Sequence, residues 1–106
     1  MPAFSRRLDE LAGGNAGAVL ERIQHDLLKE PLRGKLVPGL GGIRKARAIN
    51  PGRGKGKRGG YRYFYLYRER RGHIYLLFIL DRNEQEGLAA GERTELRALV
   101  AELGKS

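Results

Sequence analysis

The segment YRYFYLYRERRGHIYLLFILD, residues 61–81, decides the fold of this 106-residue chain. Residues 61–67 and 73–81 are rich in aromatic and β-branched side chains, which favour β-strands. Residues 69–72, Glu-Arg-Arg-Gly, are suited to a hairpin turn between them. Residues 74–80 are apolar on both faces of the second strand, so we expect a central strand that is covered from both sides.

The flanking segments supply a third strand and a covering helix. Residues 43–49 alternate as a strand, with Lys45 and Arg47 on one face together with Ile43 and Ile49, and Arg44, Ala46 and Ala48 on the other. Residues 91–104 carry an apolar stripe at helical spacing, Leu96, Leu99, Val100 and Leu103. We expect this helix to cover the second face of the sheet.

The N-terminal third reads as two helices. Phe4, Leu8 and Leu11 have the spacing of a short amphipathic helix, and residues 13–15, Gly-Gly-Asn, interrupt it. A second helix is predicted over residues 16–29, and the segments 35–42 and 50–60 read as loops. The sequence therefore predicts an α+β domain over residues 1–106, in which two N-terminal helices pack on a three-stranded antiparallel meander that a C-terminal helix closes.

Positive charge is concentrated in one part of the chain. The formal net charge is +9, and residues 41–62 contain eight lysines and arginines and no acid. These are Arg44, Lys45, Arg47, Arg53, Lys55, Lys57, Arg58 and Arg62. Unpaired cations are too costly to bury, so this segment lies beside water or a polyanion. A concentrated positive field favours nucleic acid or an acidic protein, whereas a basic surface that only maintains solubility is the simpler alternative.

Composition excludes several classes of function. The chain has no cysteine, so a disulfide framework and a thiolate metal site are impossible. His25 and His73 fall at positions expected to be solvated, and no histidine or carboxylate cluster has metal-ligand spacing, so no metal site and no cofactor are expected. The longest apolar run is far too short to cross a bilayer, and the N-terminus lacks a signal-peptide pattern. We expect a cytoplasmic protein without membrane contact.

The glycine-rich segment and Arg62 each allow two interpretations. The glycines of residues 52–60 resemble a phosphate-binding loop only weakly, because both neighbours are strands, and a hairpin tip with incidental charge is the alternative. Arg62 shares a strand face with Phe64 and Leu66, so it needs a counter-charge. That charge is either a protein carboxylate, with Glu84 and Glu86 as candidates, or the phosphate of a bound nucleic acid.

Three motifs in order resemble the RelE/HigB-type toxins of bacterial type II toxin–antitoxin modules. They are GKLVPGLGGIRKAR at 34–47, GKRGGYRYFY at 56–65 and IYLLFILDRNEQEGL at 74–88. The resemblance covers nearly the whole chain and implies a metal-independent endoribonuclease. Such an enzyme cuts mRNA in the ribosomal A site and is silenced by a cognate antitoxin, here a helix-turn-helix DNA-binding protein. The related ParE branch acts on DNA gyrase, and a non-catalytic basic RNA-binding protein is a further alternative.

The resemblance also implies roles for individual residues. Lys45 would be the base or a cation that shapes the base, Arg47 and Arg62 would stabilise the transition state, and Arg82 would act on the leaving side. Further RNA contacts would come from Arg44, Arg53, Lys55, Lys57, Arg58 and Asn83. The chain departs from the family in three places, one of which is that the tyrosine with which some members stack on a base after the last strand has no counterpart near Leu88. We expect no strand ahead of the first helix, and Ala89, Ala90 and Gly91 replace the serine or threonine cap of the last helix.

Overall fold

A computed structural model describes residues 2–49, 60–82 and 87–104 of the chain. The elements follow one another as α1 (Pro2–Ala12), η1 (Gly13–Asn15), α2 (Ala16–Lys29), β1 (Lys35–Leu36), β2 (Arg44–Ala48), β3 (Tyr61–Arg68), η3 (Glu69–Arg71), β4 (His73–Asp81) and α3 (Ala90–Gly104). The strands form one antiparallel sheet in the order β1-β2-β3-β4. The α+β class and the helix–helix–meander–helix order predicted from the sequence are confirmed.

Helices α1 and α2 cover one face of the sheet, which we call the tyrosine face. Phe4 and Leu8 of α1 lie one turn apart and are buried. From α2, the predicted second helix, Val19, Ile23 and Leu27 lie on one side and enter the same core. The sheet meets them with Tyr61, Tyr63, Tyr65 and Ile79.

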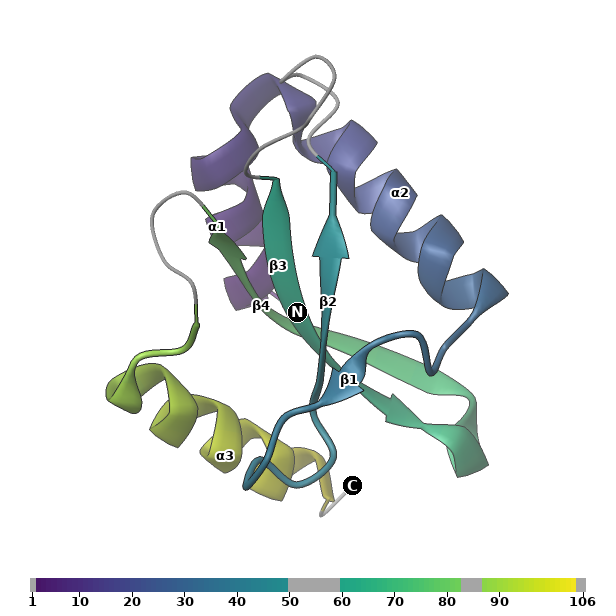
Figure 1. Ribbon diagram of the computed structural model, residues 1–106, viewed down its shortest axis with the longest axis vertical. Helices are drawn as coiled ribbons and strands as arrows, with labels where there is room; N and C mark the ends of the chain where they lie inside the picture. Colours follow the sequence, from purple (N-terminus) through teal and green to yellow (C-terminus); the bar gives the residue numbers. More distant parts are fainter. Residues whose placement is uncertain (1, 50–59, 83–86, 105–106) are drawn as a thin grey trace.

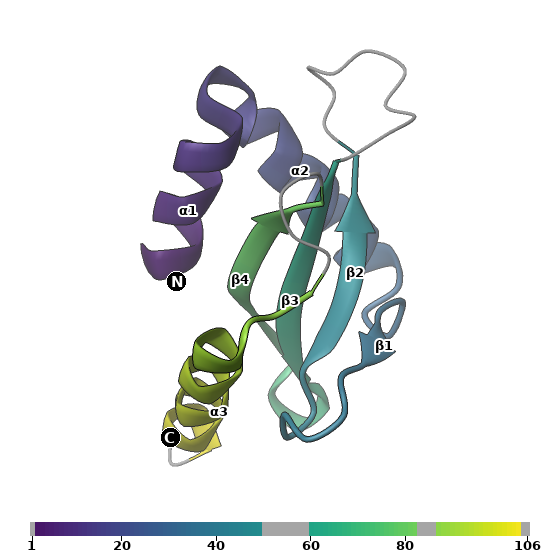
Figure 2. The same ribbon diagram turned by 60° about the vertical axis from the view of Figure 1, so that its left-hand side comes forward.

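Helix α3 packs on the opposite face, which we call the α3 face. Leu96 is buried there, with Leu99, Val100 and Leu103 partly buried, as their spacing predicts. They rest on apolar residues of β3, β4 and the β1–β2 loop, among them Ile43, Phe64, Leu66, Leu77 and Leu80. Figures 1 and 2 show α3 toward the lower end of the sheet and α1 toward the upper end. Among the described elements, no helix covers the upper part of the α3 face.

The start of α3 is capped although it lacks the expected serine or threonine. The carboxylate of Glu92 accepts a hydrogen bond of 2.9 Å from the backbone N–H of Ala89. This bond is one half of a capping box, in which an acidic residue three positions into the helix reaches back to the cap. The glutamate therefore compensates for part of what the alanine cannot supply.

The predicted coverage of residues 74–80 from both sides is confirmed, but their predicted central position is wrong, because β4 lies at the edge of the sheet among the described strands. Its two apolar faces reflect helices on both sides of the sheet. Arg7 of α1 occupies part of the open edge: its Nε donates to the carbonyl of Ile79 at 2.6 Å, and its guanidinium lies over the Phe78 ring. Phe64 pairs with Phe78 and Tyr65 with Leu76, so Leu77 is the extra residue of a β-bulge. Bulges and edge contacts of this kind are common protections of an exposed strand.

The sheet also has one more strand than the three predicted. Lys35 and Leu36, in a segment read as a loop, pair with Lys45 and Arg44 as β1. The carbonyl of Ile43 accepts a further bond from the N–H of Val37 at 2.9 Å. Two residues carry too little periodicity to indicate a strand, and here the partner strand rather than local preference determines the pairing.

Candidate functional site

Three of the predicted catalytic cations lie around one hollow at the edge of the sheet. Arg47 pairs with Arg62 across β2 and β3, and Lys45 precedes Arg47 by two residues, so all three lie on the α3 face. Together with Arg33 and Lys35 they line an open hollow of about 380 Å³ around Ala46. We call this hollow the basic groove. Within the part of the chain that the structure describes, β1 pairs with Arg44 and Lys45, and no further strand lies beside β2 at Ala46 and Arg47.

The charge of the basic groove is of one sign. Every residue that lines it within the described part of the chain is a lysine or an arginine, apart from Ala46. Arg33, Lys35 and Arg47 are exposed, while Lys45 and Arg62 are half-buried. Like charges at such close spacing repel one another, and a bound anion relieves that repulsion. The groove is therefore suited to hold a group of concentrated negative charge.

Arg33 is a site residue that the sequence analysis did not identify. Its Nη1 donates to the hydroxyl of Tyr63 at 2.9 Å and to the carbonyl of Arg47 at 3.3 Å. These bonds tie the loop before β1 to β2 and β3, and they hold a guanidinium at the rim of the groove. No sequence signal pointed to Arg33, because the pairing of Lys35 with Lys45 that brings its loop to the groove is not indicated by the sequence.

Buried tyrosines hold the loop from which Arg33 projects. The hydroxyl of Tyr65 donates to the carbonyl of Pro31 at 2.8 Å and accepts from the N–H of Gly34 at 2.9 Å. Burial raises the pKa of Tyr65 and that of Tyr63 above 10.0, while the neighbouring Arg33 acts in the opposite direction on both. Both hydroxyls therefore stay protonated at neutral pH, and that of Tyr65 keeps its donated bond to Pro31.

Gly34 is fixed by close contacts on the tyrosine face. A Cβ at this position would lie 2.8 Å from the carbonyl oxygen of Lys45 and 2.9 Å from the hydroxyl of Tyr65. The carbonyl of Gly34 accepts a bond of 2.7 Å from Nη1 of Arg44. Arg44, expected to contact RNA, thus points to the face opposite Lys45 and Arg47 and contributes to the scaffold of the loop.

Arg82 does not line the basic groove. It follows the last residue of β4, and its backbone N–H donates to the carbonyl of Gly60 at 3.2 Å. Leu80, two residues earlier, pairs with Arg62. Arg82 therefore lies beyond the row that contains Arg47 and Arg62, toward the upper end of the sheet.

Other predicted residues lie outside the described part of the chain. They are Arg53, Lys55, Lys57, Arg58 and Asn83 among the RNA contacts, and Glu84 and Glu86 as counter-charges for Arg62.

The described residues offer little other chemistry. They contain no group of three or more histidines and carboxylates that would hold a metal ion. Their helices are each too short or too polar for a bilayer span. His25 is exposed on α2. Nδ1 of His73, at the start of β4, lies 3.4 Å from the hydroxyl of Tyr75.

No model of a known protein family matches the chain.

Proposed function

We propose that this protein is the toxin of a type II toxin–antitoxin module, an endoribonuclease that cuts mRNA in the ribosomal A site. The observation that carries the proposal is the basic groove, in which five cations surround a small hollow. The motifs at 34–47 and 56–65, which resemble RelE/HigB-type toxins, supply four of those cations: Lys35, Lys45, Arg47 and Arg62.

The groove has the properties expected of a phosphate site. Guanidinium groups present forked donors that match two oxygens of a phosphate, and lysine adds a compact positive charge. Contacts to the RNA backbone position a protein without reading the sequence. In an A-site nuclease the ribosome presents the codon, so the enzyme needs few base contacts of its own. The open form of the groove, at a strand edge, agrees with a strand of RNA as the ligand.

The reaction that fits these residues is an internal transfer at phosphorus. The ribose 2′-oxygen attacks the adjacent phosphorus, the bond between phosphorus and the 5′-oxygen breaks, and a 2′,3′-cyclic phosphate is formed. The 2′-hydroxyl proton passes to a base, and the departing 5′-oxygen takes up a proton, so charge and atoms balance without a redox step. Negative charge accumulates on the non-bridging oxygens in the transition state, and positioned donors stabilise it.

The roles are those that the family resemblance implies, and the positions of the residues are compatible with them. Arg47 and Arg62, paired across β2 and β3, would hold the non-bridging oxygens. Lys45 is half-buried one row away and would act on the 2′-hydroxyl as the base or as the cation that orients it. Arg82 lies beyond this row, and we assign it to the 5′-oxygen side of the same strand. Arg33 would position Arg47 through its backbone carbonyl.

The partners of such a protein are the ribosome carrying mRNA and a cognate antitoxin. A cationic enzyme that cuts mRNA has to be neutralised while it is not needed, and the family resemblance implies that a helix-turn-helix DNA-binding antitoxin does this.

The test compares Arg62→Ala with the wild type on growth arrest and on mRNA ends. After induction, the wild type is expected to produce new 3′ ends in phase with codons. We expect Arg62→Ala to reduce this cleavage roughly 100- to 1,000-fold, the usual cost of removing a positioned donor to a transition-state oxyanion.

A matched control is Arg6→Ala, which removes the same charge from an exposed position on α1. It should cleave as the wild type does. Undiminished toxicity of Arg62→Ala would contradict the proposal. Growth arrest without codon-phased ends would instead indicate a gyrase-directed toxin or a non-catalytic binder.

A further inference from the structure

A second basic pocket lies at the opposite end of the same sheet face. The β3–β4 turn places Arg68, Arg70 and Arg71 around a hollow of about 310 Å³, and Tyr75 and Leu103 form its apolar walls. We call it the hairpin pocket. It lies at the C-terminal end of α3, whereas the basic groove lies at the opposite end of the sheet.

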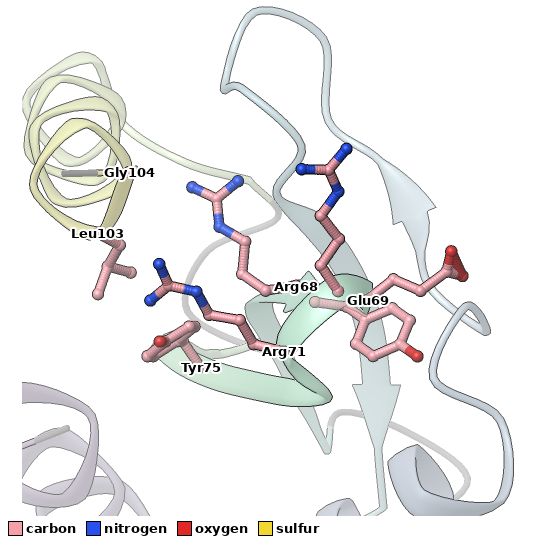
Figure 3. Close-up of a pocket in the computed structure, with 8 residues that line it drawn as sticks. Arg68, Glu69, Arg71, Tyr75, Leu103 and Gly104 are labelled. Atoms are coloured by element: carbon pink, nitrogen blue, oxygen red, sulfur yellow. The ribbon is translucent and has the colours of Figure 1, made fainter. Parts of the chain in front are cut away.

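The orientation of the side chains makes the pocket positive. Figure 3 shows the guanidiniums of Arg68 and Arg71 extending toward α3, and the carboxylate of Glu69 pointing the other way. Arg71 lies beside the ring of Tyr75 in the same view. An Nη of Arg68 approaches to 3.6 Å of the position a Cβ would take on Gly104. Two forked donors thus point toward α3, and one of them lies close to a flat aromatic ring.

Strand geometry relates the two basic sites. Arg62 and Arg68 lie six residues apart on β3, and alternation places both on the α3 face. Phe64 and Leu66, between them, are covered by α3. At the usual rise per residue the two arginines are about 20 Å apart, a distance that a few nucleotides of single-stranded RNA can span.

A structural role explains part of this arrangement. A cation at a helix C-terminus is favourable because it lies at the negative end of the helix dipole, and Arg68 is placed for this. One guanidinium suffices for that purpose, and Tyr75 in addition packs against the core beneath α3. Three arginines around a pocket with a tyrosine wall match the other use of these side chains, which is to hold a phosphate while a neighbouring base stacks.

We propose that the hairpin pocket is a second RNA-binding site. A phosphate binds Arg68 and Arg71, and the adjacent base stacks on Tyr75. This proposal rests on RNA being the ligand of the protein, as in the proposed function, but it does not depend on cleavage. Tyr75 also packs against the core beneath α3, and its ring meets that of His73 edge-on. An acidic peptide would engage the arginines alone, whereas RNA would engage both the arginines and the part of the ring that stays accessible.

The experiment measures binding of a short fluorescent single-stranded RNA by anisotropy over a salt series. We expect Arg68→Ala/Arg71→Ala to weaken binding and to lower the slope of log K against log salt by about 0.7, the change for one lost phosphate contact on a single strand. Tyr75→Leu should weaken binding roughly 5-fold or more with no change in slope. For a strand of equal length without bases, Tyr75→Leu should have no effect.

The matched control is Arg6→Ala/Arg22→Ala, which removes two charges from exposed positions on α1 and α2. If the slope and affinity of Arg68→Ala/Arg71→Ala equal those of this control, the proposal is overturned. It is also overturned if Tyr75→Leu weakens the baseless strand as much as RNA. Tighter binding of polyglutamate than of RNA, lost in Arg68→Ala/Arg71→Ala, would assign the pocket to an acidic protein instead.

Two further comparisons separate this proposal from its neighbours. If removal of Arg68 loosens α3, the variant Arg68→Lys/Arg71→Lys replaces the alanine variant, because it keeps both charges. It should retain the slope of log K against log salt but bind RNA more weakly than the wild type. A wild type that binds RNA through the hairpin pocket but does not cut it would refute the proposed nuclease and leave the second site intact. Cleavage that persists without any effect of Arg68 and Arg71 on binding would refute the second site alone.

Discussion

The eight residues of β3 alternate between two faces of the sheet, and the two faces have different roles. On the tyrosine face, Tyr61, Tyr63 and Tyr65 are fully buried, and their hydroxyls bond to a helix carbonyl, to Arg33 and to the loop before β1. On the α3 face, Phe64 and Leu66 are buried, with Arg62 and Arg68 on either side of them. Strand alternation thus separates the part that holds the fold from the part that presents charge.

The difference shows how a small domain can support a concentrated charge. Each buried tyrosine ring contributes apolar area to the core, and its hydroxyl fixes backbone that would otherwise be free. The loop at residues 31–34 is held in this way, and it carries Arg33 to the basic groove. The α3 face contributes the remaining cations. The shape of the basic groove, which lies on the α3 face, therefore depends on the tyrosine face.

Gly34→Ala tests this dependence, and we expect the largest effect from it because it disturbs both faces. The added methyl would press on the carbonyl of Lys45 and on the ring and hydroxyl of Tyr65 at under 3.0 Å. Backbone cannot yield as a flexible side chain does, so unfolding should become easier by about 3 kcal/mol, at the upper end of the range for overpacking. Thermal or urea unfolding measures this, and RNA binding at the basic groove should weaken with it.

Gly17→Ala is the control for Gly34→Ala. Gly17 lies in α2, and nothing would contact a Cβ there within 4 Å. Alanine has the higher helix propensity, so this change should leave stability unaltered or raise it by up to about 1 kcal/mol. If both variants behaved alike, the loop would not be fitted to the sheet as described, and the basic groove would not depend on the tyrosine face.

The fold was predictable from the sequence wherever a period is long enough to read. The helix stripes at 4–11, 16–27 and 96–103 and the alternation at 61–67 gave the elements and their faces. The order of strands was not predictable in the same way. Apolar residues on both faces of β4 show that layers lie above and below it, but they do not show whether another strand lies beside it. The two-residue β1 exists through its partner, and its own sequence does not indicate a strand.

The residues of the candidate site were likewise predictable only where a sequence period places them. Lys45, Arg47 and Arg62 could be placed together because two strands of known alternation carry them. Arg33 could not, since its contacts join it to residues 14 and 30 positions away. Alternation placed Arg44 on the opposite face correctly, but its bond to the carbonyl of Gly34 in the loop before β1 was not predictable. Loop conformation depends on tertiary hydrogen bonds, which have no period in the sequence.

Tyr65→Phe sharpens the comparison by removing one atom from the tyrosine face. The carbonyl of Pro31 and the N–H of Gly34 would each lose a partner, and Gly34 is buried. We expect a loss of roughly 1–3 kcal/mol in the free energy of unfolding, the cost of leaving a buried polar group unsatisfied. Tyr67→Phe is the control, because the hydroxyl of Tyr67 makes no hydrogen bond within the described residues. An equal loss in both variants would show that the hydroxyl of Tyr65 does not hold the loop.

Alkaline pH should produce the smallest effect, and it acts on the same face without any mutation. Burial raises the pKa of Tyr63 and Tyr65 above the 10.0 of an exposed tyrosine. Below about pH 10 these tyrosines are protonated in both states, so their contribution to stability is complete. Above it the unfolded chain releases their protons while the folded chain retains them, and the free energy of unfolding falls as pH rises.

The variant Tyr63→Phe/Tyr65→Phe should be less stable than the wild type at neutral pH. From about pH 9 to about pH 11 it should lose less further stability. Denaturant unfolding at several pH values measures both slopes. Equal slopes would mean that the two hydroxyls ionise as readily in the fold as in water, and that the tyrosine face is wetter than its packing against α1 and α2 implies.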